Sequence, residues 1–219
     1  MINTLLENDW IPDSLIRRRI RKLNQQRLQS EASRLLSGAK TELINELKTM
    51  PVAVETQAAN EQHYEVPAEY FKAVLGPRLK YSCCWFEDEK TSLGEAENKM
   101  MESYLERAKI EDGQTILDLG CGWGSLSIFL AERLPNCTIY SVSNSSDQIE
   151  HIKHTAKEKN LQNLHPEVQD VNSLSLMAKF DRVVSIEMFE HMRNYKALLK
   201  KVKHLLKPDG LLFIHIFCH

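Results

Sequence analysis

The residues with the clearest chemical meaning form a glycine-rich turn from Asp118 to Gly124, with the sequence DLGCGWG. Apolar residues before it predict a strand and those after it predict a helix, so the glycines would let a ligand approach the backbone closely. The dinucleotide fingerprint is G-x-G-x-x-G, whereas this turn reads D-x-G-x-G-x-G. A carboxylate at Asp118 would repel a pyrophosphate and suit an ammonium group. We therefore expect S-adenosylmethionine as the cofactor, with a turn that holds no ligand as the alternative.

A second group of reactive side chains, Glu187, Glu190 and His191, directly follows a predicted strand at residues 180–186. Parallel sheets bind ligands at their carboxyl edge, and helical positions three and four apart share a face. If a helix continues from the strand, we expect the three side chains to converge on one pocket. Glu190 or His191 would then take the proton of an amine substrate. The alternative is a solvated acid and a histidine at a helix N-terminus.

Polar residues also follow the next two predicted strands. Asn144 and Gln148 come after the second strand, where a side-chain amide can accept a hydrogen bond from one ribose hydroxyl and donate to another. Asp170 follows the third strand and is placed to accept from an adenine amino group. The alternative for Asp170 is an ordinary solvated loop acid.

Strands and helices alternate from residue 114 onward, which predicts a parallel sheet with right-handed crossovers. The expected strands are 115–119, 138–143, 167–169, 180–186 and 211–217, with helices at 125–134, 147–159 and 195–206 between them and a turn at 207–210. Upstream we expect helices at 14–36, 39–50, 68–75 and 95–108, the last opened by a capping box at Ser92, and a linker at 52–60.

The helix at 14–36 is expected to be amphipathic and carries a basic cluster. A peripheral contact with phospholipid headgroups is one interpretation, and a solvated face whose apolar stripe packs on the rest of the chain is the favoured one. The basic residues are Arg17, Arg18, Arg19, Arg21 and Lys22.

Composition bounds the remaining possibilities. The chain has 219 residues, 42% of them hydrophobic and 26% charged, with a net charge of -2, so we expect no nucleic-acid partner. The N-terminus lacks a signal-peptide layout, and the five cysteines have no CxxC spacing. We therefore expect a cytoplasmic chain with reduced thiols and no metal, leaving only a weak metal possibility at His215, Cys218 and His219.

Longer strings make the chain resemble a known family. ILDLGCGWGSLS is similar to the cofactor loop of class I methyltransferases. HYEVPAEYFKAVLGPRLKYSCCWFE, LGEAENKMM, VSIEMFEHMRNY and LLFIHIFCH together resemble the cyclopropane-fatty-acyl-phospholipid synthase superfamily, nearest to its coclaurine N-methyltransferase-like branch. The resemblance runs from about Leu5 to the last residue. It implies an α/β, Rossmann-like methyltransferase sheet with an N-terminal helical arm.

The resemblance also implies roles for particular residues. The cofactor would be covered by Tyr81 and Ser82, and its pocket would be lined by Gly120, Asn144, Gln148, Asp170, Val171 and Ile186. Ser143 stands where the family usually has a threonine and is counted with the cofactor site. From the turn itself we also expect Asp118, Gly122 and Gly124 to contact the cofactor. In the lipid-modifying relatives a bicarbonate takes the proton, and its ligands would correspond here to Cys83, Glu190 and His215. These relatives tend to have glycine where this chain has Glu187.

Three functions follow as hypotheses. The first is N-methylation of a small amine, which Glu187 favours. The second is transfer to phospholipid acyl chains, which the basic helix favours. The third is a non-catalytic module that binds the cofactor. Oligomeric state is left open.

The expected domain organisation has three parts. Residues 1–62 would form the helical arm and linker, 63–110 a segment that covers the cofactor, and 111–219 the cofactor-binding sheet. Class I methyltransferases place two further strands after the fifth, so we expect a sheet truncated after its fifth strand and a chain that is a fragment, a truncated isoform or an incomplete gene model.

Overall fold

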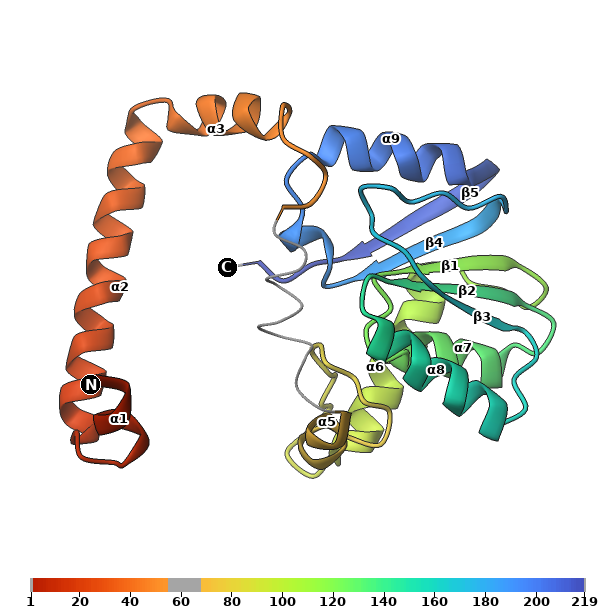
Figure 1. Cartoon of the computed structure of the whole chain (residues 1–219), viewed down its shortest axis with the longest axis horizontal. Helices are drawn as coiled ribbons and strands as arrows, with labels where there is room; N and C mark the ends of the chain where they lie inside the picture. Colours follow the sequence, from red (N-terminus) through yellow and green to blue (C-terminus); the bar gives the residue numbers. More distant parts are fainter. Residues whose placement is uncertain (1, 55–67, 219) are drawn as a thin grey trace. The chain divides into compact units, whose positions relative to one another are not determined.

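The structure is a computed structural model that describes residues 2–54 and 68–218. The chain forms two compact units, residues 1–49 and 50–219 (Figure 1). The boundary expected near residue 62 and the motif at 63–67 lie outside the described residues, so the division into three parts stays a prediction.

The first unit is helical. It contains α1 (Ile2–Glu7), α2 (Asp13–Leu36) and α3 (Ala39–Leu47). The helix expected at 14–36 is confirmed, and the helix expected at 39–50 ends earlier, at Leu47. The prediction that α2 is amphipathic is wrong. At about 100° per residue, Leu15, Ile20 and Leu28 point to different sides of the helix, so no single apolar stripe forms. Among the described helices, none is both long and apolar enough to cross a membrane.

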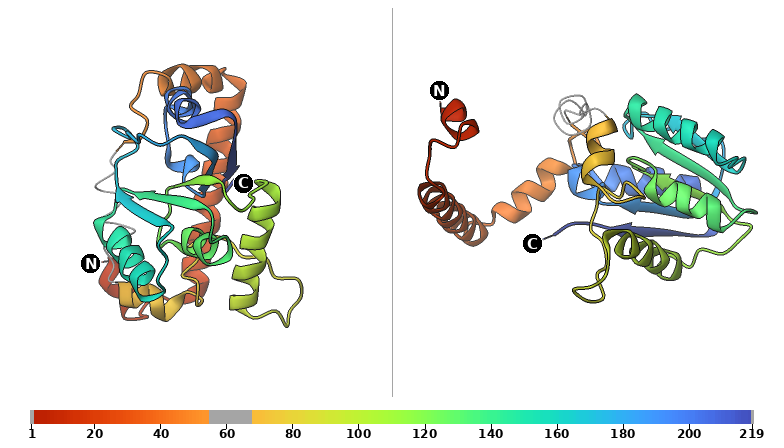
Figure 2. Two further views of the ribbon diagram at one scale, coloured as in Figure 1. Left: turned by 90° about the vertical axis from the view of Figure 1, so that its right-hand side faces the viewer. Right: turned by 90° about the horizontal axis from the view of Figure 1, so that it is seen from below.

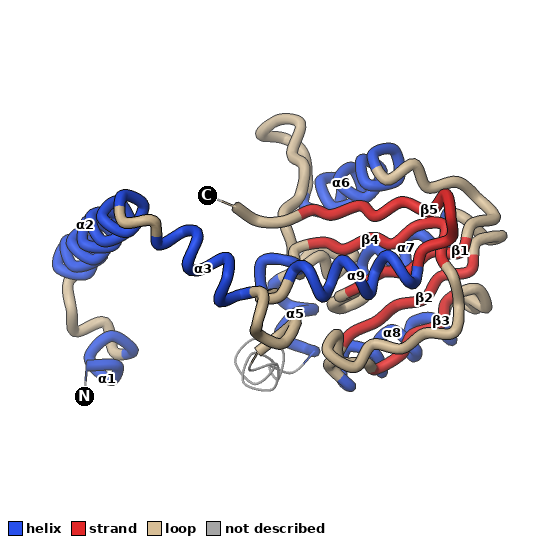
Figure 3. Tube along the Cα trace, turned by 90° about the horizontal axis from the view of Figure 1, so that it is seen from above, coloured by secondary structure: helices blue, strands red, loops and turns tan. Residues whose placement is uncertain are grey.

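A five-stranded parallel sheet forms the centre of the second unit (Figure 3). Its spatial order is β3-β2-β1-β4-β5, so β1 lies in the middle and the order reverses between β1 and β4. The expected alternation of strands and helices is therefore confirmed. The strands are β1 (Thr115–Leu119), β2 (Thr138–Ser143), β3 (Leu164–Val168), β4 (Phe180–Ile186) and β5 (Leu206–His215).

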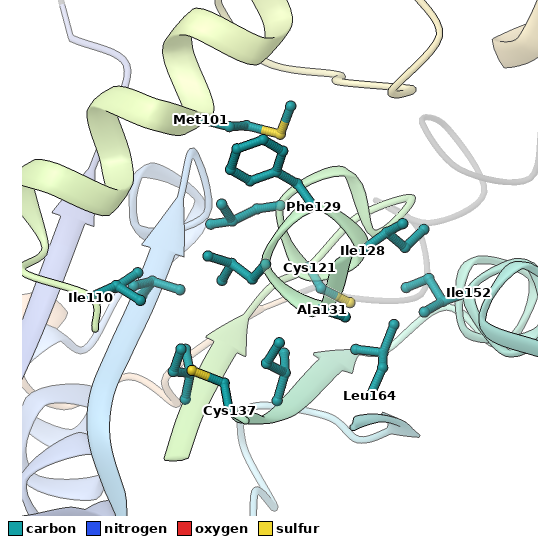
Figure 4. Packing of buried hydrophobic residues seen from close by; sticks show 14 of the residues in the cluster. Met101, Ile110, Cys121, Ile128, Phe129, Ala131, Cys137, Ile152 and Leu164 are labelled. Atoms are coloured by element: carbon teal, nitrogen blue, oxygen red, sulfur yellow. The ribbon is translucent and has the colours of Figure 1, made fainter. Parts of the chain in front are cut away.

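Helices cover both faces of this sheet (Figures 1 and 2). One face packs on α6 (Leu93–Arg107), α7 (Ser125–Arg133) and α8 (Ser146–Glu158), and the other packs on α9 (Tyr195–Leu205). Successive strand residues point to opposite faces, so Ile116 joins the first core and Leu117 the second. Figure 4 shows the first core, where Met101 of α6, Phe129 of α7 and Ile152 of α8 meet.

Side-chain caps set the starts of several helices. The capping box expected at Ser92 is confirmed, since Ser92 accepts from the Glu95 amide and Glu95 accepts from the Ser92 amide at 2.8 Å. Ser145 caps α8 by accepting from the Gln148 amide, and Asn194 caps α9. Each cap satisfies an amide that lacks a partner within its helix.

The start of the segment predicted to be a linker belongs to the fold instead. Val52 and Ala53 are buried in the core beneath α9. The Ala53 amide donates to Asn172 Oδ1 at 3.0 Å, and the Val52 carbonyl accepts from the Arg193 amide at 2.8 Å. The interpretation as a linker is therefore wrong for these two residues, while 55–60 lie outside the described residues. Short α5 (Ala68–Val74) comes next, close to its expected bounds.

The last strand differs from its prediction at both ends. β5 begins at Leu206 and ends at His215, so the residues expected to form a turn, 207–210, lie within the strand. The register shifts from the Phe180–Leu206 pair to the Arg182–Leu211 pair, so three more residues separate the partners on β5 than on β4. β5 pairs with β4 alone in the described sheet, so it lies at an edge.

We expect Gly124→Ala to lower the free energy of unfolding more than Gly113→Ala does. Both glycines are left-handed (φ of 82° and 89°), a conformation that costs an L-residue about 1–2 kcal/mol. A Cβ at Gly124 would lie 2.5 Å from Ile152 Cγ1, whereas none lies within 4 Å at Gly113. The overpacking should add about 1–3 kcal/mol. Urea unfolding measures both losses, and equal losses would contradict the packing argument.

Candidate functional site

A cavity lies at the carboxyl edge of the sheet, where β1, β2, β3 and β4 end. The strand-order reversal between β1 and β4 is the place where open α/β sheets bind ligands. Four of the expected site residues, Cys83, Gly124, Glu190 and His215, do not line this cavity. The expected residues that do are Tyr81, Ser82, Asp118, Gly120, Gly122, Ser143, Asn144, Gln148, Asp170, Val171, Ile186, Glu187 and His191.

The glycine turn is anchored to the neighbouring strand. The Gly120 and Cys121 amides both donate to the Val142 carbonyl of β2, at 2.9 and 3.0 Å. Gly122 is left-handed, and a Cβ added there would meet no protein atom within 4 Å, so the space beside it is open. The space beside Gly124 is filled by Ile152. Gly122 therefore leaves room for a ligand, and Gly124 lets the turn pack on α8.

Asp118 is a buried acid in the wall of the cavity, with 2% of its surface exposed. Its Oδ2 accepts from Ser127 Oγ at 2.6 Å, and no ion pair in the described part of the chain involves it. Burial raises the pKa of Asp118 to about 6, although the Ser127 hydrogen bond and the charge of Lys80 oppose this. A carboxylate held in this way is stabilised by a cationic ligand group.

The amide of Gln148 is only half satisfied by protein. Ser143 Oγ donates to Gln148 Oε1 at 2.7 Å, so Ser143 positions the amide. Gln148 Nε2 and Trp123 Nε1 are buried in the cavity wall without a hydrogen-bond partner among the described residues. The nitrogen can therefore donate to a ligand oxygen, and the oxygen keeps a second lone pair, so the expected double role of Gln148 stays a prediction.

Asp170 lies in the loop after β3, together with Val171. Its Oδ1 accepts from the Asn172 amide at 2.6 Å, which fixes the turn, and both Asp170 and Val171 line the cavity. The expected contact of Asp170 with an adenine amino group stays a prediction.

Glu187 ends β4 in an unusual conformation. It has a φ of 50°, which is sparsely populated by residues other than glycine and often marks a functional site. Its amide donates to the His215 carbonyl of β5 at 2.7 Å, and its Oε1 accepts from the Cys83 amide at 3.1 Å. The backbone therefore turns sharply after the strand, and the carboxylate lies at the cavity.

The prediction that a helix continues from β4 is wrong, because a short 3-10 turn at Phe189–His191 follows the strand instead. As a result Glu187 and His191 line the cavity while Glu190 does not. Glu190 Oε1 instead accepts from the Phe217 amide at 3.0 Å, and its Oε2 is buried without a hydrogen-bond partner in the described chain. The three side chains do not share one helical face.

Cys83 and His215 lie beside Glu187. Cys83 Sγ is 3.6 Å from His215 Nε2, and one donor atom from each of the three residues lies within 4.8 Å of the others. His215 thus groups with Cys83 and Glu187, away from the expected Cys218, and His219 lies outside the described residues. Burial, followed by the Glu187 charge, raises the pKa of the Cys83 thiol. A protonated thiol opposes metal binding, which requires the thiolate.

Sequence reasoning missed several polar residues of the cavity wall, among them Lys80 and Tyr104. Lys80 directly precedes the expected pair Tyr81 and Ser82, which is a signal that the pattern contained. Tyr104 is on α6, outside every string quoted above, and no local pattern marks it.

This fold and edge cavity define an α/β protein of the Rossmann-like methyltransferase class. A crystal structure of coclaurine N-methyltransferase bound to N-methylheliamine and SAH superposes with a TM-score of 0.89 at 37% identity, covering 99% of this chain and 63% of that one. The chain belongs to the mycolic acid cyclopropane synthetase family, whose model matches residues 53–219. The expected fold and family resemblance are confirmed.

Curated relatives come from both branches of that resemblance. An (S)-coclaurine N-methyltransferase of Thalictrum flavum subsp. glaucum is 38% identical over 217 residues, 98% of this chain and 60% of that protein. The cyclopropane-fatty-acyl-phospholipid synthase of Escherichia coli (strain K12) is 29% identical over 157 residues, 71% of this chain and 39% of that enzyme. The chain therefore spans about 60% of the length of the first relative.

We expect Asp118→Asn to stabilise the chain without ligand at pH 7.5. The pKa of Asp118 is raised to about 6 in the folded state, so ionised Asp118 destabilises the fold above that pH by about 3 kcal/mol at most. The gain should shrink as the pH falls from 6 toward 4, where the folded wild-type chain is protonated. Urea unfolding across this range measures it, and a pH-independent difference would contradict the assignment.

Proposed function

We propose that this chain binds S-adenosylmethionine and serves methyl transfer to the nitrogen of a small amine. The observation that carries the proposal is Asp118, a buried carboxylate without an ion-pair partner in the cavity wall. A phosphate-bearing nucleotide would be repelled there, whereas an amino-acid ammonium would be stabilised. The 38% identity to an N-methyltransferase supports the same conclusion.

The cavity wall fits the parts of this cofactor. Gln148 Nε2 is available to donate to a ribose hydroxyl, and Asn144 lies next to it at the end of β2. Asp170 and Val171 would hold the adenine, and Tyr81 and Ser82 would cover the bound molecule. When bound, S-adenosylmethionine supplies a methyl group already activated by a sulfonium, so the protein aligns the reactants and excludes water.

Removal of a proton from the amine is the remaining task. We assign it to the acids and histidine that follow β4, with Glu187 and His191 at the cavity and Glu190 behind them. Glu187 is held by the Cys83 amide, beside His215, so its carboxylate has a defined direction. A carboxylate also attracts a protonated amine, which favours an amine over an alkene as acceptor.

The second candidate is transfer to phospholipid acyl chains, supported by the Escherichia coli relative. The peripheral membrane contact of α2 belongs with this candidate and stays a prediction.

A cytoplasmic, reducing location is supported by the free thiols of the adjacent Cys83 and Cys84. Assays on an amine panel and on phospholipid vesicles separate the two candidates, and cofactor binding without turnover on either would favour the non-catalytic module.

Calorimetric titration with S-adenosylmethionine tests the cofactor. We expect the chain to bind it and Gly122→Val to abolish binding, because the new side chain would fill open space in the cavity. Gly113→Ala, in a distant turn, is the control. Binding of NAD in place of S-adenosylmethionine, or full binding by the valine variant, would refute the placement.

Turnover of the full-length gene product tests the acceptor side. We expect Glu187→Gln to lower the rate of amine methylation about 100-fold or more, typical of a lost general base, while affinity for S-adenosylmethionine stays within about threefold. Glu150→Gln, an exposed acid on α8, is the matched control. Equal loss of turnover and cofactor affinity would contradict the role of Glu187.

A further inference from the structure

Lys80 places a buried cation beside the cavity. Only 4% of its surface is exposed. Its Nζ donates to Ser82 Oγ and to Tyr104 Oη, the latter at 3.3 Å, and lies 5.1 Å from the centre of the Tyr104 ring. Both partners are neutral, and an ammonium has three donors. Among the described residues, one N–H of Lys80 is therefore left without a hydrogen-bond acceptor.

No anion of the described chain neutralises this charge at close range. None of the ion pairs within 4.0 Å in that part of the chain includes Lys80. A buried charge without a counter-ion costs several kcal/mol. Burial accordingly lowers the pKa of Lys80, although the ionised forms of Cys84 and Cys83 and the carboxylates of Glu187 and Glu97 oppose this from beyond ion-pair distance.

The nearby acids are committed to other partners. Glu97 is fully buried and accepts from the Arg78 amide at 3.0 Å and from the Lys80 amide at 3.2 Å, so it holds the backbone and not the ammonium. Asp118 accepts from Ser127, and Glu187 accepts from the Cys83 amide. The site therefore has a fixed cation that lacks an anion.

The surroundings of Lys80 indicate where in the cavity that anion would lie. Its hydrogen-bond partners, Ser82 and Tyr104, both line the cavity. The Tyr104 ring lies 5.4 Å from the ring of His215 on β5, and the Cys83 amide, next to Ser82, donates to Glu187 at the end of β4. These contacts place Lys80 on the β4 side of the cavity. The groups assigned to the nucleoside lie at the ends of β2 and β3, on the other side of β1. The ammonium is thus at the end where the amino-acid part of the cofactor would bind.

We propose that Lys80 binds the α-carboxylate of the methionine part of S-adenosylmethionine. Asp118 would bind the α-ammonium, so the two side chains together would recognise the zwitterionic amino-acid group. The ligand carboxylate would then supply the counter-ion that Lys80 lacks among the described residues. This inference rests on the proposed function, because it names a partner for the cofactor of the same site. The rival is a purely structural lysine that ties Ser82 to Tyr104.

A ligand without the carboxylate separates the two roles. Calorimetry compares S-adenosylmethionine with decarboxylated S-adenosylmethionine on the wild-type chain, Lys80→Met and Lys80→Arg. A charge-assisted hydrogen bond predicts that the wild type prefers the carboxylated ligand about 10- to 100-fold. Lys80→Met should lose this preference by weakening the first ligand only, and Lys80→Arg should keep most of it. Lys157→Met, an exposed lysine on α8, is the control.

Two outcomes would overturn the assignment. Equal affinity of the wild-type chain for the two ligands would do so even if Lys80→Met does not fold, and an equal loss of both ligands in Lys80→Met would leave only the structural role. If the wild type binds S-adenosylmethionine but shows no preference, the proposed function survives and this inference fails. If it binds neither ligand, the proposed function fails as well.

Discussion

The pairing of β1 with β2 on one side and β4 on the other is the constraint on which the site depends. Parallel pairing brings the carboxyl ends of these strands to one edge, and the strand order reverses there. The carbonyl of Val142 then holds two amides of the glycine turn, which fixes that turn above the sheet. Each lining residue that follows a strand reaches the cavity through this arrangement.

Two buried charged side chains in the cavity wall, Asp118 and Lys80, lower the stability of the folded chain. Asp118 and Lys80 are both buried and have opposite sign, yet they do not form an ion pair with each other or with another described residue. Burial moves their pKa values in opposite directions, upward for the acid and downward for the amine. Under the proposal for Lys80, a ligand that supplied both opposite charges would relieve this cost, and the site would then select for such a ligand.

The relatives of this chain include an N-methyltransferase and a cyclopropane-fatty-acyl-phospholipid synthase. In this chain, the residues after β4 carry reactive side chains that line the cavity. The left-handed backbone at Glu187 aims one carboxylate at the cavity. Cys83 and His215 surround that carboxylate, while Glu190 binds the Phe217 amide. Under the proposed function, an acid at the cavity would suit a cationic acceptor, and this short segment would decide the acceptor class.

The sequence by itself determined the order of strands and helices, the glycine turn after β1 and the capping box at Ser92, because each depends on residues near one another in the chain. Only the tertiary structure decided that Ser143 donates to the Gln148 oxygen while the Gln148 nitrogen has no partner among the described residues. The tertiary structure also decided the partners of Lys80 and Glu190. Lys80 donates to Tyr104 of α6, and Glu190 accepts from the amide of Phe217, which follows β5. The direction of a side chain depends on contacts between distant elements, and periodicity along the chain carries no record of them.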